Sequence, residues 1–204
     1  MRRVHGGCAG LALSAALVLV AGCTPVIRDG GVGDADAWAA RRGTLAPRDQ
    51  WRLEGRVAID AGHEGYTGSL TWDQQGGSLE ARFDGPFGVG GLRISGDGGG
   101  LTVRTHRGET FTVTDPERDL GARLGWSLPI HSMRYWMAGI PAPGAPFSAE
   151  VDGLGRPRTL VQHGWTVSYG EYRPSGDLDL PRRLTLERDA VRIKLVAERW
   201  TLRP

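Results

Sequence analysis

Cys23 is the residue with the most specific chemistry in this sequence. Val20-Ala21-Gly22-Cys23 has the form of a bacterial lipobox, in which the chain is cleaved before the Cys and the Cys thiol is lipidated. Arg2 and Arg3 form a positive n-region, and the apolar run Leu11–Val20 is shorter than the ~20 residues that a bilayer span needs. An ordinary signal peptide with a chance Cys is the alternative. The sequence therefore predicts a lipoprotein signal peptide over residues 1–22 and a lipid on Cys23.

Lipidation at Cys23 would fix the location of the chain. Cys8 leaves with the signal peptide, so Cys23 is the only Cys of the mature chain and no internal disulfide is expected. Each buried methylene contributes about 0.8 kcal/mol, so the two or three acyl chains of a bacterial lipoprotein anchor it firmly. The next residue is Thr24, and similarity to the sorting rule of bacterial lipoproteins, in which Asp marks retention in the inner membrane, favours the outer membrane. We expect a protein at the periplasmic face of the outer membrane.

The remaining polar residues give no pattern for catalysis or metal binding. Four histidines remain after cleavage, none at metal-ligand spacing from another: His63, His106, His131 and His163. Ser127 and Ser132 lie near His131, but there is no G-x-S-x-G elbow and no P-loop for ATP. We therefore expect no enzyme, no catalytic residue, no metal and no cofactor. An anchored hydrolase using Ser127 is a minor alternative.

Charge argues against nucleic acid as a partner. The chain has 25 basic and 23 acidic residues, and loss of Arg2 and Arg3 leaves a mature net charge of zero. No basic patch is dense enough to indicate nucleic-acid binding. Arg182-Arg183 is read as a solvated turn pair, with contact to anionic headgroups as the alternative.

The stretch 66–94 organises the rest of the chain. Apolar residues alternate in three short runs, 66–72, 79–83 and 89–94, which predict antiparallel strands. Gln74-Gln75-Gly76-Gly77 is a hairpin signal between the first two runs. Gly85-Pro86-Phe87-Gly88 joins the next two and puts a large aromatic residue at a turn, where polar residues are usual. Phe87 either forms an exposed tip or folds back onto the sheet, and the residues alone leave both readings open.

The same alternation predicts the remaining strands, with two helices among them. The further strands are 51–59, 101–103, 111–113, 147–151, a segment ending near Val161, 165–169, 184–186 and 191–200. Asp115 as N-cap and Pro116 at the first helical position begin one helix. A second covers about Ile130 to Met137 and ends at Gly139. About eleven antiparallel strands must curl strongly, and we expect the two central helices to cover an apolar hollow.

The mature chain of 182 residues is long enough for one domain with a sizeable core. Residues 23–35 are Gly- and Asp-rich without periodicity and predict a flexible tether. A short helix is expected from Asp36 to Ala46, capped by Asp34 or Asp36. We assign residues 36–204 to a single domain.

Several short motifs, taken in order, resemble the LolB family. Besides the lipobox and the Gly85–Gly88 turn they are Trp51-x-x-x-Gly55-Arg56-Val57, Gly68-Ser69-Leu70-x-Trp72, Leu128-Pro129-Ile130, Trp136-Met137-x-Gly139-x-Pro141, Gly164-Trp165-x-Val167-x-Tyr169 and Arg192-Ile193-Lys194-Leu195 to Trp200. Each motif is weak alone, but their order and spacing cover nearly all of the mature chain. The family is that of the outer-membrane lipoproteins that receive other lipoproteins from the periplasmic carrier LolA and insert them into the membrane.

This resemblance implies a fold and a set of functional residues. The fold is mainly β, an incomplete antiparallel β-barrel of about eleven strands with a helical lid or plug around a hydrophobic cavity for acyl chains. A protruding membrane-insertion loop corresponds to Pro86, Phe87 and Gly88, with Phe87 as the apolar tip. Partners would be LolA, client lipoproteins through their acyl chains, and the outer membrane, with the protein itself a monomer.

Candidate cavity residues are the large apolar side chains of the strands and the second helix. They are Leu70, Trp72, Phe83, Leu92, Met133, Trp136, Met137 and Trp165. Plain core packing is the competing interpretation for each, and we expect only about half to touch the cavity. A lipocalin-like lipoprotein that stores a small apolar ligand is the alternative function, and an exposed tip at Phe87 would argue against it.

Overall fold

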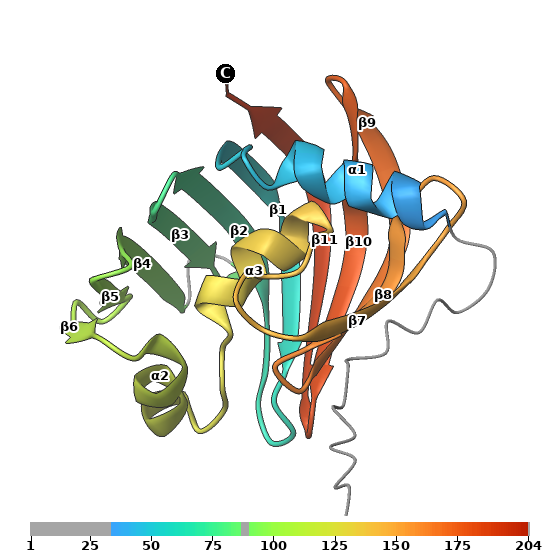
Figure 1. The fold of residues 1–204 in the computed structure, drawn as a ribbon. Helices are drawn as coiled ribbons and strands as arrows, with labels where there is room; N and C mark the ends of the chain where they lie inside the picture. Colours follow the sequence, from blue (N-terminus) through green and yellow to red (C-terminus); the bar gives the residue numbers. More distant parts are fainter. Residues whose placement is uncertain (1–33, 87–89, 204) are drawn as a thin grey trace, which may run out of the picture.

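A computed structural model describes residues 34–86 and 90–203 of the chain. Over these residues eleven strands form one antiparallel sheet, and three helices accompany it (Figure 1). The strands are β1 (Gln50–Asp60), β2 (Gly65–Gln75), β3 (Ser78–Asp84), β4 (Gly91–Asp97), β5 (Gly100–Thr105), β6 (Thr110–Val113), β7 (Phe147–Val151), β8 (Pro157–Gln162), β9 (Trp165–Ser175), β10 (Leu178–Arg188) and β11 (Val191–Leu202). The helices are α1 (Ala35–Leu45), α2 (Pro116–Leu124) and α3 (Ile130–Ala138). The expected mainly β fold of about eleven strands is confirmed.

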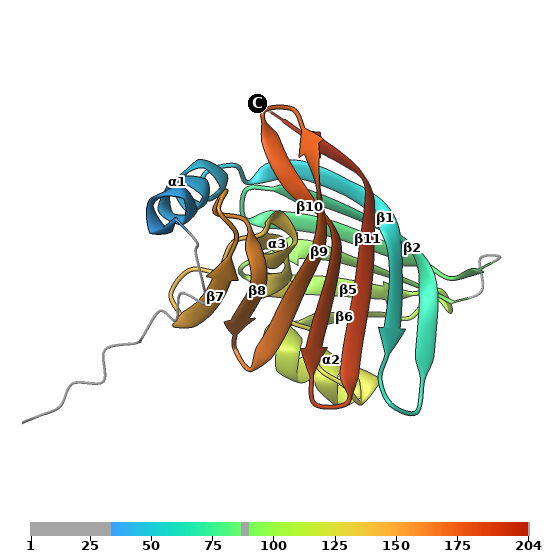
Figure 2. The same ribbon diagram turned by 90° about the vertical axis from the view of Figure 1, so that its right-hand side faces the viewer.

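The sheet is open. Its strand order is β6-β5-β4-β3-β2-β1-β11-β10-β9-β8-β7, so β6 and β7 are the two edges and do not pair. Every strand pairs with its neighbour in sequence except across the β6–β7 break, and the β1–β11 pair joins the two ends of the chain at the centre. The sheet curls around α2 and α3, which stand behind β8 to β11 in Figure 2. The predicted incomplete barrel is therefore confirmed as a curled sheet that does not close.

Glycine allows the central strands to bend. The β1–β11 register shifts between Glu54 and Gly55, and a Cβ at Gly55 would lie 2.2 Å from the Val196 carbonyl oxygen. A Cβ at Gly68 in β2 would likewise lie 2.2 Å from the carbonyl oxygen of Asp84. No other residue type fits such close approaches of two backbones, so these positions set the curvature of the sheet.

Both helices between β6 and β7 begin where the sequence predicts, and the second also ends there. The Asp115 carboxylate accepts a hydrogen bond from the Arg118 backbone N–H at 3.3 Å, and Pro116 is the first residue of α2. The α3 helix ends at Gly139, whose φ of 79° is the left-handed conformation that glycine tolerates best. None of the helices in the described part of the chain is long and apolar enough to span a membrane.

Hydrogen bonds to both halves of the sheet hold α3 across its concave side, and those to β8 and β9 are buried. The indole N–H of Trp136 donates to the Gln162 side-chain oxygen on β8 at 2.9 Å, and the Tyr169 hydroxyl on β9 donates to the Trp136 carbonyl at 2.9 Å. On the other side, the Arg134 guanidinium donates to the carbonyl of Gly76 in the β2–β3 turn at 3.0 Å. The α3 helix thus connects the two halves of the sheet.

Helix α1 lies over the ends of the C-terminal strands (Figure 1). Asp34 caps it, so the helix begins one residue before the predicted domain start at residue 36. Trp38 packs edge-on against Phe147 of β7 at 6.5 Å between ring centroids, and Leu45 packs with Ile140 and Leu180 in a small second core cluster. This helix therefore belongs to the folded unit.

Candidate functional site

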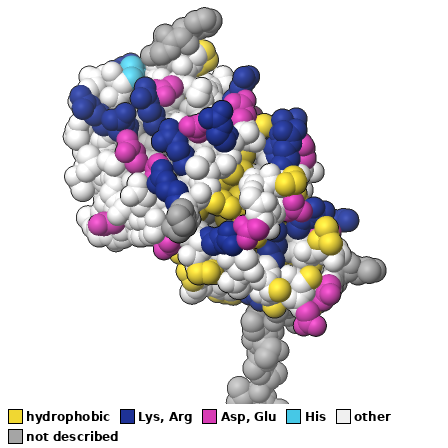
Figure 3. Space-filling view, turned by 90° about the horizontal axis from the view of Figure 1, so that it is seen from above, with side chains coloured by type: hydrophobic (Ala, Val, Ile, Leu, Met, Phe, Trp, Pro, Cys, Tyr) yellow, Lys and Arg dark blue, Asp and Glu magenta, His cyan; other side chains and the backbone are white. Residues whose placement is uncertain are grey.

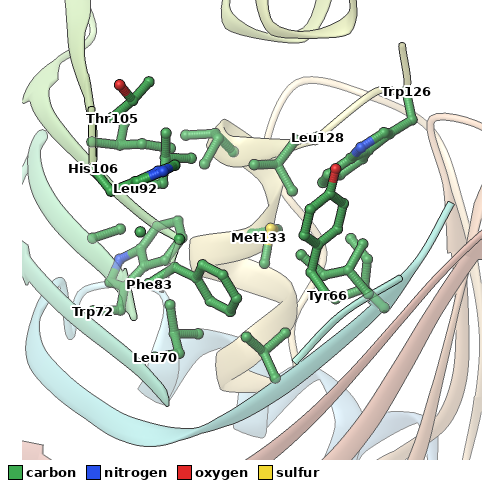
Figure 4. A pocket seen from close by; sticks show the side chains of 18 of the residues that line it. Tyr66, Leu70, Trp72, Phe83, Leu92, Thr105, His106, Trp126, Leu128 and Met133 are labelled. Atoms are coloured by element: carbon green, nitrogen blue, oxygen red, sulfur yellow. The ribbon is translucent and has the colours of Figure 1, made fainter. Parts of the chain in front are cut away.

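An apolar cavity of about 470 Å³ lies between the N-terminal half of the sheet and the α2–α3 segment (Figure 4). Strands β1 to β4 and β11 form its wall, with Val57, Ile59, Tyr66, Leu70, Trp72, Ala81, Phe83, Leu92, Ile94 and Ile193. Trp126, Leu128, Ile130 and Met133 form its roof. The volume falls in the range of about 300–1,000 Å³ that is typical of small-molecule sites.

The strand register explains why these side chains share one face. Leu70 of β2 is directly opposite Phe83 of β3, and Phe83 is directly opposite Leu92 of β4. Trp72, Ala81 and Ile94 form a second such row. Because side chains alternate between faces with a period of two, both rows point to the concave side. A continuous apolar wall follows from the alternation that the sequence shows.

The wall is fixed by a buried glutamine. The indole N–H of Trp72 donates to the side-chain oxygen of Gln74 at 3.0 Å. The Gln74 amide group then donates to the carbonyls of Gly76 and Ser78, at 2.8 and 3.0 Å. Since Gln74 is 1% exposed, these bonds satisfy polar groups that would otherwise be costly to bury. Trp72 can therefore present its ring to the cavity without an unpaired N–H.

The cavity is polar at only one end. Thr105, His106, Arg107 and Glu109, from the end of β5 and the β5–β6 turn, line this end. Tyr66 is 39% exposed on the opposite side of the opening, and its hydroxyl donates to Glu64. Figure 4 shows Thr105 and His106 across the cavity from Tyr66 and Trp126. An elongated apolar group could thus lie inside with a polar group at this end.

Five of the eight candidate cavity residues face the cavity. They are Leu70, Trp72, Phe83, Leu92 and Met133. Trp136, Met137 and Trp165 do not line it, and each is 0% exposed. The Gln162 bond directs Trp136 toward β8, where its ring lies 6.5 Å from that of Trp165. These three residues therefore fill the space over the C-terminal half of the sheet as packed core.

The cavity roof contains residues that the sequence did not single out as lining. Trp126 and Leu128 lie in the connection between α2 and α3, and Ile130 begins α3. Leu128 and Ile130 flank Pro129 in one of the motifs quoted above, but a short apolar motif in a loop does not reveal what it covers. Their position depends on how α3 crosses the sheet, which no local pattern encodes.

The predicted insertion loop is described only at its base. The Gly85 N–H donates to the Gly90 carbonyl at 2.9 Å, which closes the loop between β3 and β4, and Pro86 is exposed. Phe87 and Gly88 lie outside the described residues, as does the predicted lipidation site Cys23. Their roles remain predictions.

The polar residues singled out by the sequence do not come together as a metal site among residues 34–86 and 90–203. No group of three or more His, Cys, Asp or Glu side chains could hold a metal ion there. Ser132 is buried on α3 whereas the neighbouring His131 is exposed, and in this part of the chain no hydrogen bond joins His131 to Ser132 or Ser127.

Comparison with known proteins assigns the family. Residues 49–200 match the family model described as "Outer membrane lipoprotein LolB". An outer-membrane lipoprotein LolB of Nitrosococcus oceani is 37% identical over 188 residues, which is 91% of this chain and 94% of the relative. A LolB of Pseudomonas putida is 34% identical over 170 residues, 83% of each chain.

Solved structures show the same fold at low sequence identity. A LolA superfamily protein from Nitrosomonas europaea superimposes with a TM-score of 0.53 at 10% identity, covering 83% of this chain and 94% of that chain. A DUF1329 family protein from Desulfovibrio piger gives a TM-score of 0.56 at 9% identity, covering 82% of this chain and 90% of that one. The family match, the close relatives and the curled open sheet agree, and the chain belongs to the LolB family of outer-membrane lipoproteins.

Proposed function

We propose that this protein is an outer-membrane receptor that accepts lipoproteins from the periplasmic carrier LolA, shields their acyl chains in the cavity, and inserts them into the membrane. The observation that carries the proposal is the apolar cavity of about 470 Å³ in a chain of the LolB family. An acyl chain in water costs about 0.8 kcal/mol per methylene. A receiver of lipoproteins must therefore offer an apolar surface in place of water.

The cavity volume limits how much lipid it holds in this conformation. At about 30 Å³ for a group the size of a water molecule, 470 Å³ corresponds to roughly 16 such groups. That is the space of about one acyl chain. A client lipoprotein has two or three acyl chains. To hold them all, the roof must open further; otherwise one acyl chain stays at the polar end of the cavity.

We propose that the two parts of the roof differ in how firmly they are held. α3 has hydrogen bonds to both halves of the sheet, through Arg134 and Trp136. Trp126 lies before α3, where the chain turns after Gly125, and its indole N–H is buried with no hydrogen-bond partner in the described part of the chain. We propose that the 125–129 connection moves to admit lipid while α3 stays in place.

The flanking segments would supply the anchor and the membrane contact. Residues 1–22 act as the signal peptide and Cys23 carries the lipid. The residues from Cys23 up to the Asp34 cap of α1 are the tether of the domain at the periplasmic face. Pro86, Phe87 and Gly88 form the insertion loop, with the Phe87 ring entering the membrane interface. The protein acts as a monomer without a catalytic step or nucleotide, so transfer runs downhill from carrier to receptor to bilayer.

A transfer assay with a chain that begins at Thr24 tests this proposal. Both core clusters are built from residues at or after position 38, so this chain retains them. Carrier-bound lipoprotein and liposomes are mixed with the native sequence, with Phe87→Glu, and with Leu154→Glu as control. Leu154 is 65% exposed in the turn between β7 and β8, so the control adds the same charge at another apolar surface position.

The expected result is uptake by all three chains and delivery to liposomes by all except Phe87→Glu. Failure of the native sequence to take lipoprotein from the carrier would contradict the receptor assignment. A small apolar ligand found at one-to-one stoichiometry by native mass spectrometry would then support the storage alternative.

A further inference from the structure

Three arginines stand side by side on the convex face of the sheet next to the insertion loop. Arg82 of β3 is directly opposite Arg93 of β4, and Arg93 is directly opposite Arg104 of β5. All three side chains are exposed, and each neighbours a residue that faces the cavity. We call Arg82, Arg93 and Arg104 the arginine row.

This arrangement works against folding. Residues directly opposite on antiparallel strands have Cβ atoms about 4.5–5.5 Å apart, and like charges there are destabilising. The row contains two such pairs in succession. Asp84 pairs with Arg82 at 2.7 Å and Glu80 with Arg93 at 3.6 Å, while Arg104 has no ion pair among the described residues. Sheet stability alone does not account for a third arginine in this position.

The arginine row lines a surface hollow of about 280 Å³. The same hollow is lined by Asp84, His106 and the two glycines that follow the loop, Gly90 and Gly91. Phe83, Leu92 and Thr105 line both this hollow and the apolar cavity. The two spaces therefore lie next to each other at the end of β3–β5, where the loop leaves the sheet. Figure 3 shows several basic side chains, in dark blue, on the left-hand side of the molecule, which is the side on which Figure 1 draws β3–β5.

We propose that the arginine row binds the phosphate of anionic phospholipids in the membrane that receives the lipoproteins. Guanidinium groups bind phosphate oxygens through paired, charge-assisted hydrogen bonds. Arg104, which has no ion pair among the described residues, and Arg93, whose 3.6 Å pair with Glu80 is longer than the 2.7 Å pair of Arg82 with Asp84, supply most of the binding. The proposal rests on the proposed function in one respect, that the loop between Gly85 and Gly90 faces a membrane.

The geometry favours a membrane lipid over an acidic protein surface. A phospholipid carries its phosphate a few bonds from its acyl chains, and the arginine row likewise lies beside an apolar cavity, with Phe83, Leu92 and Thr105 lining both spaces. Gly85 and Gly90 at the loop base are three residues from Arg82 and Arg93 respectively, so a membrane that contacts the loop also meets the row. Headgroup contacts here would hold the cavity opening against the leaflet.

Vesicle flotation with the chain that begins at Thr24 tests the proposal without carrier or client. The vesicles are phosphatidylcholine alone or phosphatidylcholine mixed with phosphatidylglycerol. The test variant is Arg93→Gln with Arg104→Gln, and the matched control is Arg158→Gln with Arg173→Gln. Each pair removes two exposed arginines, one with an ion pair to a glutamate and one without among the described residues. Thermal melts verify that both variants fold.

We expect the phosphatidylglycerol vesicles to bind the native sequence and the control equally and the row variant about thirtyfold more weakly, which is the combined contribution of two arginines near an anionic surface. Phosphatidylcholine vesicles should not distinguish the three proteins. Equal binding of the row variant and the control to phosphatidylglycerol would overturn the proposal. If the row variant then also took lipoprotein from the carrier more slowly, the row would be a docking site for an acidic protein.

This outcome is separable from the receptor function. Uptake from the carrier and delivery to neutral liposomes do not require the arginine row, so the transfer assay can succeed while flotation shows no effect. The reverse outcome is also distinguishable. If flotation shows weaker headgroup binding only in the row variant, but the native chain takes up no lipoprotein, the arginine-row proposal stands and the receptor function fails.

Discussion

The two halves of the sheet use similar residues for opposite purposes. Over β7–β10 the space under α3 is filled, and Trp136 and Trp165 are each 0% exposed. Over β1–β5 an equally apolar face encloses a cavity of about 470 Å³. Each half contains a tryptophan bonded to a buried glutamine, Trp136 with Gln162 and Trp72 with Gln74. The comparison shows that the packed half fixes α3 so that the hollow half can remain open.

Trp136→Ala should have the largest effect on stability. The side chain is fully buried and hydrogen-bonded, so its removal should cost about 3–5 kcal/mol of unfolding free energy. Chemical denaturation measures this cost. A loss below about 1 kcal/mol would show that the C-terminal half is not packed as described.

Gln162→Leu should be the next most damaging change. The substitution leaves the Trp136 indole N–H and the Ala142 backbone groups without their buried partner, at about 1–3 kcal/mol for an unsatisfied group. Amide hydrogen exchange should show faster exchange in α3. If the amides of α3 exchanged as slowly as in the native chain, the hydrogen bonds to β8 would not be what holds α3 in place.

A matched pair of enlargements distinguishes the packed half from the hollow half. Ala149 of β7 is 4% exposed and belongs to the packed core, whereas Ala81 of β3 is 6% exposed and lines the cavity. Ala149→Leu should cost about 1–3 kcal/mol through overpacking. Ala81→Leu should cost less than about 1 kcal/mol, because its added methylenes enter empty space.

The same two substitutions should affect lipid affinity in the opposite order from stability, with the larger effect from Ala81→Leu. Ala81→Leu takes up part of the cavity and should weaken binding of a fluorescent fatty acid several-fold, while Ala149→Leu should leave the affinity unchanged. Fluorescence titration of both folded variants measures this. Equal affinities for the two variants would show that the ligand does not use the cavity.

The smallest expected effect concerns pH. Hydrogen bonds from Arg182, with Arg173 and Arg183, lower the pKa of Glu171 on β9 from 4.5 to about 2. A lowered folded pKa stabilises the protein above the unfolded value, and this stabilisation is lost as the pH falls from about 4.5 to about 2. The Glu171→Gln variant should therefore lose less stability over this range than the native chain. Parallel pH dependences of Tm for the two proteins would contradict the assignment.

The sequence predicted the elements of the fold better than the position of the site. Alternation identified all eleven strands, and Asp115, Pro116 and Gly139 marked helix ends, because these signals are local. The sequence did not separate Met133, which lines the cavity, from Met137, which is four residues along the same helix and fully buried. That distinction depends on where α3 crosses the sheet.

The arginine row illustrates the same limit. Arg82, Arg93 and Arg104 are each ordinary exposed strand residues in the sequence. Only the register of β3, β4 and β5 brings them into line, and register depends on the whole sheet. The resemblance to the LolB family was identified correctly from short motifs, since their order reflects the fold as a whole.

Photoaffinity labelling tests the central claim most directly. A lipopeptide with a diazirine in its acyl chain is presented to the chain that begins at Thr24, irradiated, and the labelled residues are identified by mass spectrometry. Labelling is predicted at Leu70, Phe83 and Met133, with Trp136 and Trp165 unlabelled. Adducts confined to Trp136 and Trp165, or to the convex face of the sheet, would contradict an acyl-chain site in the hollow half.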